Sequence, residues 1–137
     1  STLQRTRQTV EHLRYPSKAL KNLDEIDAGI CDGYTYQEIA ERWPEDFAAR
    51  SQDKLRYRYP RGESYRDVVD RLDGVIIELE RLRHPIVVVA HQAVLRCLYA
   101  YLTDQPQERV PHIEMPLHTV IKLTPATYGA EEQRFQL

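Results

Sequence analysis

The strongest amphipathic pattern in the chain lies between residues 65 and 82, where apolar residues recur at intervals of three and four. Ser64 stands just before this stretch and Asp67 follows three positions later, which is the spacing of a helix-capping pair. The apolar stripe consists of Val68, Val69, Leu72, Val75, Ile76 and Leu79. The pattern predicts a long surface helix that begins at Ser64 and ends at His84-Pro85.

A continuous apolar run, Ile86 to Ala90, follows this helix and is mostly β-branched. Such a run is typical of a parallel strand that is buried on both faces. The residues Gln92 to Leu102 then predict the next helix, so that His91 stands between a buried strand and a helix.

Weaker patterns predict shorter elements on either side. Thr6 to Leu13 indicates the end of an amphipathic helix with Val10 and Leu13 facing inward. Ala19 to Leu23 indicates a short extended segment. Thr35 to Glu38 has capping-box spacing and predicts a short helix that ends before Pro44.

The stretch from Ser51 to Gly62 is dense in charge and tyrosine and is interpreted as an ordered loop. Thr119 to Leu123 and Arg134 to Leu137 are strand candidates. Helices that alternate with strands predict an α/β domain with a mostly parallel sheet. The chain shows no repeat or linker, so we expect residues 1–137 to form one domain.

Composition narrows the class of protein. The chain has 137 residues, of which 42% are hydrophobic and 29% charged, with a formal net charge of −2. These values are typical of a globular protein and give no reason to expect nucleic-acid or membrane binding. Cys31 and Cys97 lie far apart in no metal-like spacing, which favours a reducing, cytosolic compartment. The chain begins at Ser1 without an initiator Met and soon enters a helical pattern, so we expect it to derive from a longer protein.

His91 is the first candidate for chemistry. The carboxyl ends of parallel strands form the ligand crevice of an open sheet, and helix N-termini there attract anions. A histidine at this point can contact a phosphoryl group or exchange a proton near neutral pH. A structural role, in which His91 only caps the helix or bonds a neighbour, remains open from position alone.

Glu25 and Asp27 lie between predicted elements. A carboxyl group withdrawn from water can donate a proton to a leaving oxygen, although isolated loop acids more often make turns and caps. A basic cluster with interleaved tyrosines follows, and its cations suit phosphate oxygens unless the loop is simply solvated. The cluster consists of Arg50, Lys54, Arg56, Arg58 and Arg61 with Tyr57, Tyr59 and Tyr65, and Asp53 and Glu63 are placed to neutralise part of it.

Other chemistries find little support. His12, His84, His112 and His118 show no metal-ligand spacing. The chain contains no glycine-rich phosphate loop and no Gly-x-Ser-x-Gly elbow.

Taken together, the segments resemble the bisphosphatase domain of the 6-phosphofructo-2-kinase/fructose-2,6-bisphosphatase family, a branch of the histidine phosphatase superfamily. The runs that carry the resemblance are Glu25-Ile26-Asp27-Ala28-Gly29, Arg56-Tyr57-Arg58-Tyr59-Pro60, Gly62-Glu63-Ser64-Tyr65 and His91-Gln92-Ala93-Val94. The resemblance extends from Ser1-Thr2-Leu3 to Pro116-Leu117-His118-Thr119 and so covers nearly the whole chain.

The resemblance implies a three-layer, phosphoglycerate-mutase-like histidine-phosphatase fold with a mostly parallel sheet whose first strand is missing from the chain. It implies hydrolysis of the 2-phosphate of fructose 2,6-bisphosphate through a phosphohistidine, without a metal or other cofactor. It also implies fusion to an ATP-binding 6-phosphofructo-2-kinase domain in the parent protein, and leaves a homodimer open.

Roles carry over residue by residue. Glu25 matches the general acid, His91 the second histidine beside the nucleophile, and Arg5 an arginine of the phosphate pocket. The positions that hold the sugar and its 6-phosphate are matched by Tyr36, Arg50, Lys54, Tyr65, Gln92 and Arg96.

One departure from the family pattern is large. The nucleophilic histidine of the family lies in an Arg-His-Gly motif, and this chain has no such motif. Two alternatives therefore stand beside the phosphatase: a phosphoglycerate-mutase-like phosphoryl transferase, and a non-catalytic fragment that binds phosphate ligands but is itself inactive.

Overall fold

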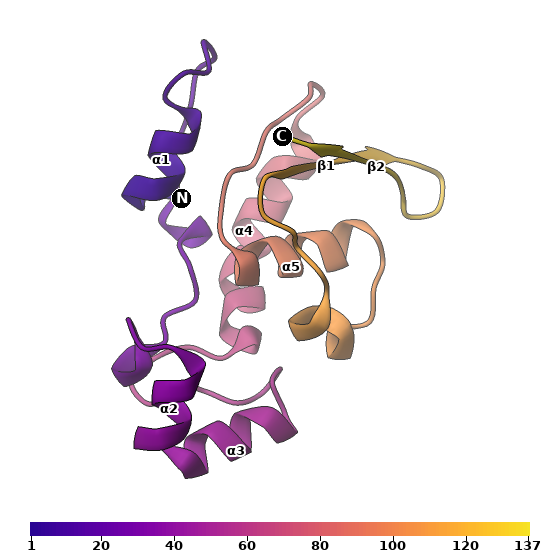
Figure 1. Ribbon diagram of the computed structural model, residues 1–137. Coiled ribbons are helices and arrows are strands. Elements are labelled where there is room, and N and C mark those ends of the chain that lie inside the picture. Colours follow the sequence, from indigo (N-terminus) through magenta and orange to yellow (C-terminus); the bar gives the residue numbers. More distant parts are fainter.

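The computed structural model describes residues 1–137 and consists mainly of helices (Figure 1). Figure 1 shows α4 and α5 at the centre, α2 and α3 together at one end, and a two-stranded hairpin at the other. The elements in chain order are α1 (Gln4–Val10), α2 (Tyr36–Arg42), α3 (Pro44–Gln52), α4 (Tyr65–Arg81), α5 (Gln92–Leu102), β1 (Thr119–Pro125) and β2 (Ala130–Gln136). Short 3₁₀ helices lie at Lys21–Leu23, Gly29–Cys31 and Gln107–His112.

Helix α4 forms as its pattern predicts. The Ser64 side chain accepts a hydrogen bond from the backbone N–H of Asp67, and the Asp67 side chain bonds back to the Ser64 N–H. This capping box satisfies two backbone donors that the first turn leaves without partners. Helix α2 begins with the same device at Thr35 and Glu38, which confirms the second predicted capping box.

The main core lies between α4 and α5. Val68 and Leu72 of α4 are fully buried, and Val94 of α5 is equally inaccessible. Burial of one such side chain contributes about 1.5–3 kcal/mol, so the contact between these two helices contributes substantially to stability. A smaller core of Cys31, Ile39 and Tyr59 lies between α2 and the loop that precedes α4.

The segment Ile86–Ala90 differs from the prediction. It is extended but forms no strand pairing, and Val87 is 72% exposed, so the expected parallel strand, buried on both faces, is not formed. The physical reason is that no other strand lies beside it to complete a ladder. Its one backbone partner is the amino group of Ser1, which donates to the Val89 carbonyl oxygen at 3.3 Å.

The sheet consists of β1 and β2, which pair in antiparallel fashion from Thr119 opposite Gln136 to Pro125 opposite Ala130. The connection at 126–129 is too short for a parallel crossover, so these two strands must be antiparallel. Both strands were expected, but the parallel arrangement is wrong for the sheet that this chain contains.

Several boundaries also differ from expectation. Helix α1 ends at Val10 and Leu13 is 49% exposed, so Leu13 does not face inward. The segment expected to be extended turns into the 3₁₀ helix Lys21–Leu23. Helix α3 was not predicted and enters the loop expected from Ser51, although Pro44 at its first turn is a known start signal.

Two glycines allow the loop after residue 26 to approach the loop before α4. Gly29 has φ +53°, and a Cβ there would lie 2.0 Å from the Pro60 carbonyl oxygen. A Cβ on Gly62 would lie 2.3 Å from the Asp27 carbonyl oxygen. This close backbone contact fixes the position of the segment that carries Glu25.

None of the helices is both long enough and apolar enough to cross a membrane.

Candidate functional site

A cavity of about 440 Å³ opens between the start of α5, the start of α2 and the segment around Glu25. Six of the residues expected at the site border it: Glu25, Tyr36, Arg50, Tyr65, Gln92 and Arg96. They come from parts of the chain up to 71 positions apart: Tyr65 lies on α4, Gln92 and Arg96 lie on α5, and the other three precede α4. Lys54, His91 and Arg5 are not among the residues that line the cavity.

Glu25 lies against the N-terminus of α5. Its Oε1 atom accepts hydrogen bonds from the backbone N–H of Ile26 at 2.9 Å and of Ala93 at 3.3 Å. The N-terminal N–H groups of a helix attract negative charge, so α5 holds the Glu25 carboxyl group in one orientation. Its second oxygen makes no hydrogen bond within the protein and is available to a ligand.

His91 occupies the N-cap position of α5 and is buried. Its Nδ1 atom accepts a hydrogen bond from Nε of Arg5 at 3.2 Å, and its Nε2 atom lies 2.9 Å from Oγ of Ser1. An arginine can only donate, so Nδ1 carries no proton and the proton of the neutral ring is on Nε2. Burial, followed by the positive charge of Arg5, lowers the pKa of His91 to about 4.

Asp24 orders the residues around His91. The hydroxyl group of Ser1 donates to Oδ1 of Asp24 at 2.9 Å, and Thr2 contributes its backbone N–H and its hydroxyl group at 2.6 Å each. Because the Ser1 hydroxyl group gives its proton to Asp24, it must accept from His91 Nε2, which agrees with the tautomer set by Arg5. These bonds from Thr2 and Ser1 lower the pKa of Asp24 despite its partial burial.

Arg5 reaches His91 from the first turn of α1. The structure therefore brings Arg5 and His91 together, as the resemblance implies, although neither side chain borders the cavity itself. Gln92, the residue that directly follows His91, does border the cavity.

Cations border the other part of the cavity. The guanidinium of Arg50 lies 4.9 Å from the ring centre of Tyr36 and 5.7 Å from that of Tyr59, and its Nη2 donates to the Tyr36 hydroxyl group at 3.3 Å. Arg96 donates from Nη1 to the hydroxyl group of Tyr65 at 2.9 Å. Stacking and hydrogen bonding hold both guanidinium groups in place before any ligand arrives.

Lys54 belongs to the same electropositive region. Burial lowers its pKa, and the charges of Arg50 and Arg96 lower it further. A nearby anion would relieve this repulsion and favour the charged ammonium group. The region is thus suited to bind an anion.

The rest of the basic cluster has partners elsewhere. Arg56 pairs with Asp53 at 3.2 Å, as expected, and Arg58 pairs with Asp67 at 2.6 Å. Glu63 does not neutralise this cluster, because it pairs with Arg71 at 2.8 Å. Asp27 accepts a hydrogen bond from the N–H of Gly29, which is the local turn role that loop acids often have.

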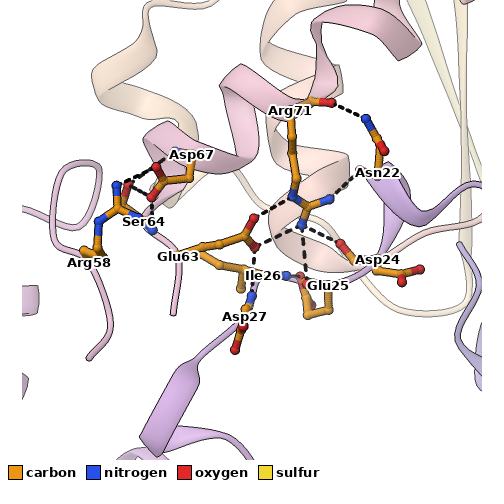
Figure 2. Close-up of polar contacts among 10 residues, drawn as sticks. All are labelled: Asn22, Asp24, Glu25, Ile26, Asp27, Arg58, Glu63, Ser64, Asp67 and Arg71. Atoms are coloured by element: carbon orange, nitrogen blue, oxygen red, sulfur yellow. Dashed lines mark hydrogen bonds and ion pairs between the residues drawn. The ribbon is translucent and has the colours of Figure 1, made fainter. Parts of the chain in front are cut away.

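Sequence reasoning missed the polar network behind Glu25, in which Arg71 and Glu63 bond to the backbone of residues 22–27 (Figure 2). A signal was present: Arg71 falls three residues after Val68 and four before Val75, so it lies on the buried stripe of α4. A charged residue at such a position needs a partner. Ser1 and Asp24 carried no comparable signal.

The arrangement combines a carboxyl group at a helix N-terminus with a set of fixed cations across a cavity. Such a site can bind a multiply charged anion and transfer a proton to or from it. The cavity volume lies in the usual range for small-molecule sites. The remaining histidines, His12, His84, His112 and His118, are exposed and do not line the cavity.

Comparison with known proteins places these features in context. Residues 1–137 match the family described as "Histidine phosphatase superfamily (branch 1)". The chain is 55% identical over 138 residues to a 6-phosphofructo-2-kinase/fructose-2,6-bisphosphatase of Arabidopsis thaliana, covering 100% of this chain and 18% of that protein. It is 56% identical over 131 residues to the fructose-2,6-bisphosphatase of Saccharomyces cerevisiae, covering 96% of this chain and 29% of that protein. The chain therefore spans less than a third of the length of these relatives.

Solved structures show the same fold. The alpha-ribazole phosphatase from Shigella flexneri matches with a TM-score of 0.78 at 20% identity, over 93% of this chain and 64% of that one. Bacillus stearothermophilus YhfR matches with a TM-score of 0.72 at 26% identity, over 96% of this chain and 68% of that one. The α/β fold class expected from the sequence is confirmed by these likenesses.

Proposed function

The chain belongs to the histidine phosphatase superfamily (branch 1), and from this membership we propose that the protein that carries it hydrolyses the 2-phosphate of fructose 2,6-bisphosphate. The products are fructose 6-phosphate and inorganic phosphate. The observation that carries the proposal is the cavity that Glu25 shares with Arg50 and Arg96. The relatives at 55% and 56% identity, whose names include fructose-2,6-bisphosphatase, support the choice of substrate.

The charges of the site fit a sugar bisphosphate. Such a ligand brings two phosphate groups, and guanidinium forks bind phosphate oxygens in a bidentate manner. We assign the sugar and its 6-phosphate to Tyr36, Arg50, Lys54, Tyr65, Gln92 and Arg96. The 2-phosphate then lies toward the start of α5, near Glu25 and His91.

Glu25 is assigned as the general acid. As a histidine nitrogen of the protein forms a bond to phosphorus and the bond between phosphorus and the C2 oxygen breaks, that oxygen takes a proton from the Glu25 carboxyl group and leaves as a hydroxyl group. In the second step a water oxygen bonds to phosphorus as the phosphorus–nitrogen bond breaks, and the Glu25 carboxylate accepts a proton from that water. Inorganic phosphate is released and the acid is restored.

His91 and Arg5 are assigned to the transferring phosphoryl group. In the unliganded structure the Nδ1 lone pair of His91 accepts from Arg5. A phosphoryl group beside the ring would raise the pKa of His91, and the protonated ring could then donate to a phosphate oxygen together with the guanidinium of Arg5.

We assign the nucleophile of the proposed reaction to a histidine outside residues 1–137, because no histidine of this chain lines the cavity. The 137 residues alone are therefore proposed to bind the substrate without turning it over. Fusion to an ATP-binding 6-phosphofructo-2-kinase domain is also proposed, since names that join this kinase to the bisphosphatase recur among the relatives. A cytosolic location completes the proposal.

The full-length protein tests the proposal through phosphate release from fructose 2,6-bisphosphate, with 3-phosphoglycerate as the competing substrate. We expect Glu25→Gln and His91→Ala each to lower turnover about 10²- to 10⁴-fold. Arg66→Met, an exposed arginine on α4, is the matched control and should retain activity. Undiminished turnover in both site variants would contradict the assigned roles, and a preference for 3-phosphoglycerate would favour the mutase-like alternative.

A further inference from the structure

The side chain of Arg71 bonds to the backbone of the segment that carries Glu25 (Figure 2). Its Nη2 atom donates to the carbonyl oxygen of Asp24 at 2.7 Å and to that of Glu25 at 3.4 Å, and its Nη1 atom donates to the carbonyl oxygen of Asn22. One guanidinium group thus contacts three peptide groups within four residues. The Glu25 backbone cannot shift without breaking these bonds.

Glu63 completes the contact from the other end of the segment. Its two carboxylate oxygens accept from Nε and Nη2 of Arg71 at 2.8 and 3.2 Å, and Oε2 also accepts from the N–H of Asp27 at 2.9 Å. The two side chains are only 21% and 24% exposed. An ion pair withdrawn from water to this degree is screened little by salt.

The support behind this pair is rigid. Arg71 lies in the middle of the 17-residue helix α4, and its own carbonyl oxygen accepts from the Asn22 side chain at 2.8 Å. Glu63 is held by its backbone N–H, which donates to the Asp27 carbonyl oxygen at 2.8 Å. The segment 22–27 is therefore fixed at both ends to the body of the domain.

We propose that Arg71 and Glu63 are positioning residues that place the Glu25 carboxyl group for proton transfer to the leaving oxygen. The inference rests on the proposed function of Glu25 and extends it to two residues that do not line the cavity. A general acid must lie within hydrogen-bond reach of the oxygen that it protonates, and a displacement of about 1 Å can lower the rate about 10²-fold.

The leaving group of the substrate provides a selective test. Protonation matters for a sugar leaving oxygen but not for the weakly basic oxygen of p-nitrophenyl phosphate. In the full-length protein, Arg71→Met should lower kcat for fructose 2,6-bisphosphate about 10²-fold with KM changed less than about threefold. The same variant should retain most of its activity on the aryl phosphate.

Three comparisons separate positioning of Glu25 from the effect of charge and from general damage to the protein. Arg71→Lys keeps the positive charge without the planar fork and should remain impaired. Arg66→Met removes an exposed arginine from the same helix and should behave like the unchanged protein. In a Glu25→Gln background, Arg71→Met should cause little further loss, because the carboxyl group that it positions is already absent.

A readout without turnover keeps the two proposals distinguishable. The Ala93 N–H donates to Oε1 of Glu25, so its NMR shift reports whether that carboxyl group is held at the start of α5. With selective alanine labelling, the Ala93 signal should move in Arg71→Met toward its position in Glu25→Ala, and should stay unchanged in Arg66→Met. If fructose 2,6-bisphosphate is not hydrolysed but the signal moves in this way, only the proposed function fails. Equal loss of activity on both substrates, or an Ala93 signal that is unchanged in Arg71→Met, overturns the positioning role.

Discussion

The Nε atom of Arg5 donates a 3.2 Å hydrogen bond to Nδ1 of His91, across 86 positions of the sequence. This bond joins the first helix to the N-terminus of α5 and leaves His91 neutral in the free protein. The ring can therefore change its protonation state when an anion replaces Arg5 as the main neighbour of Nδ1. Several measurable properties depend on this contact.

The pKa of His91 should respond both to the loss of Arg5 and to the binding of an anion. NMR titration of the ring C–H signals should give a pKa of about 4 in the free protein. Removal of a nearby positive charge in Arg5→Met should raise this pKa toward the ordinary value, and saturating inorganic phosphate should raise it in the unchanged protein. A pKa near 6.5 that ignores both changes would contradict the buried, Arg5-bonded ring.

Stability should fall as the solution becomes acidic through a defined window. The pKa of His91 is lower in the folded state than in the unfolded state, so the unfolded chain binds more protons between about pH 6.5 and 4. The free energy of unfolding should therefore rise with pH across this window and fall as pH is lowered through it. Urea unfolding at several pH values measures this, and His91→Gln should show a shallower dependence. Identical slopes in the two proteins would rule out the linkage.

Glycine substitutions should have opposite effects at two positions. Gly29→Ala places a Cβ 2.0 Å from the Pro60 carbonyl oxygen at φ +53° and should destabilise the fold by about 2–4 kcal/mol. Gly74→Ala, in the middle of α4 with no atom within 4 Å of the added carbon, should stabilise it by about 0.5–1 kcal/mol. The denaturant midpoints of the two variants measure these changes in stability. Equal midpoints for Gly29→Ala and Gly74→Ala would show that the loop at Gly29 adapts to the added carbon.

Arg50 should contribute to ligand affinity through its shape as well as its charge. Arg50→Met removes a fixed phosphate donor and should weaken binding of fructose 6-phosphate about 10- to 100-fold by calorimetry. Arg50→Lys keeps the charge but loses the contacts of the guanidinium with the rings of Tyr36 and Tyr59. Its affinity for fructose 6-phosphate should therefore lie between that of the unchanged protein and that of Arg50→Met. Gln37→Met, an exposed neighbour on α2, serves as the control. If Arg50→Met binds fructose 6-phosphate as tightly as the unchanged protein, Arg50 is not a ligand-binding residue.

Local sequence signals predicted the elements that local forces determine. The capping boxes at Thr35 and Ser64 and the span of α5 are confirmed because caps and apolar periodicity act within one helix. The pairing of Ile86–Ala90 could not be settled in this way, since a strand depends on a neighbour elsewhere in the chain. The same limit applies to Leu13, whose apolar character alone does not provide a partner surface.

The site shows a similar division. Glu25, Arg50 and Arg96 were named from residue type and resemblance, and the structure places them around one cavity. The network of Arg71 and Glu63 was missed because these side chains bond to backbone carbonyl and N–H groups. Every residue has such groups, so the sequence does not indicate which of them act as partners. Only the placement of Arg71 on the apolar stripe hinted at it.

The backbone of Ile86–Ala90, which forms no strand pairing, should make the melting of the 137-residue chain depend on protein concentration. Apart from the Val89 carbonyl oxygen, the N–H and C=O groups of this β-branched segment have no backbone partner, and such a segment pairs readily with the same segment of another molecule. Mass action then links folding to self-association, so the melting temperature should shift as the sample is diluted. A single dilution series in the calorimeter would reveal this, and a melting temperature that is constant over the series would show that the edge stays closed.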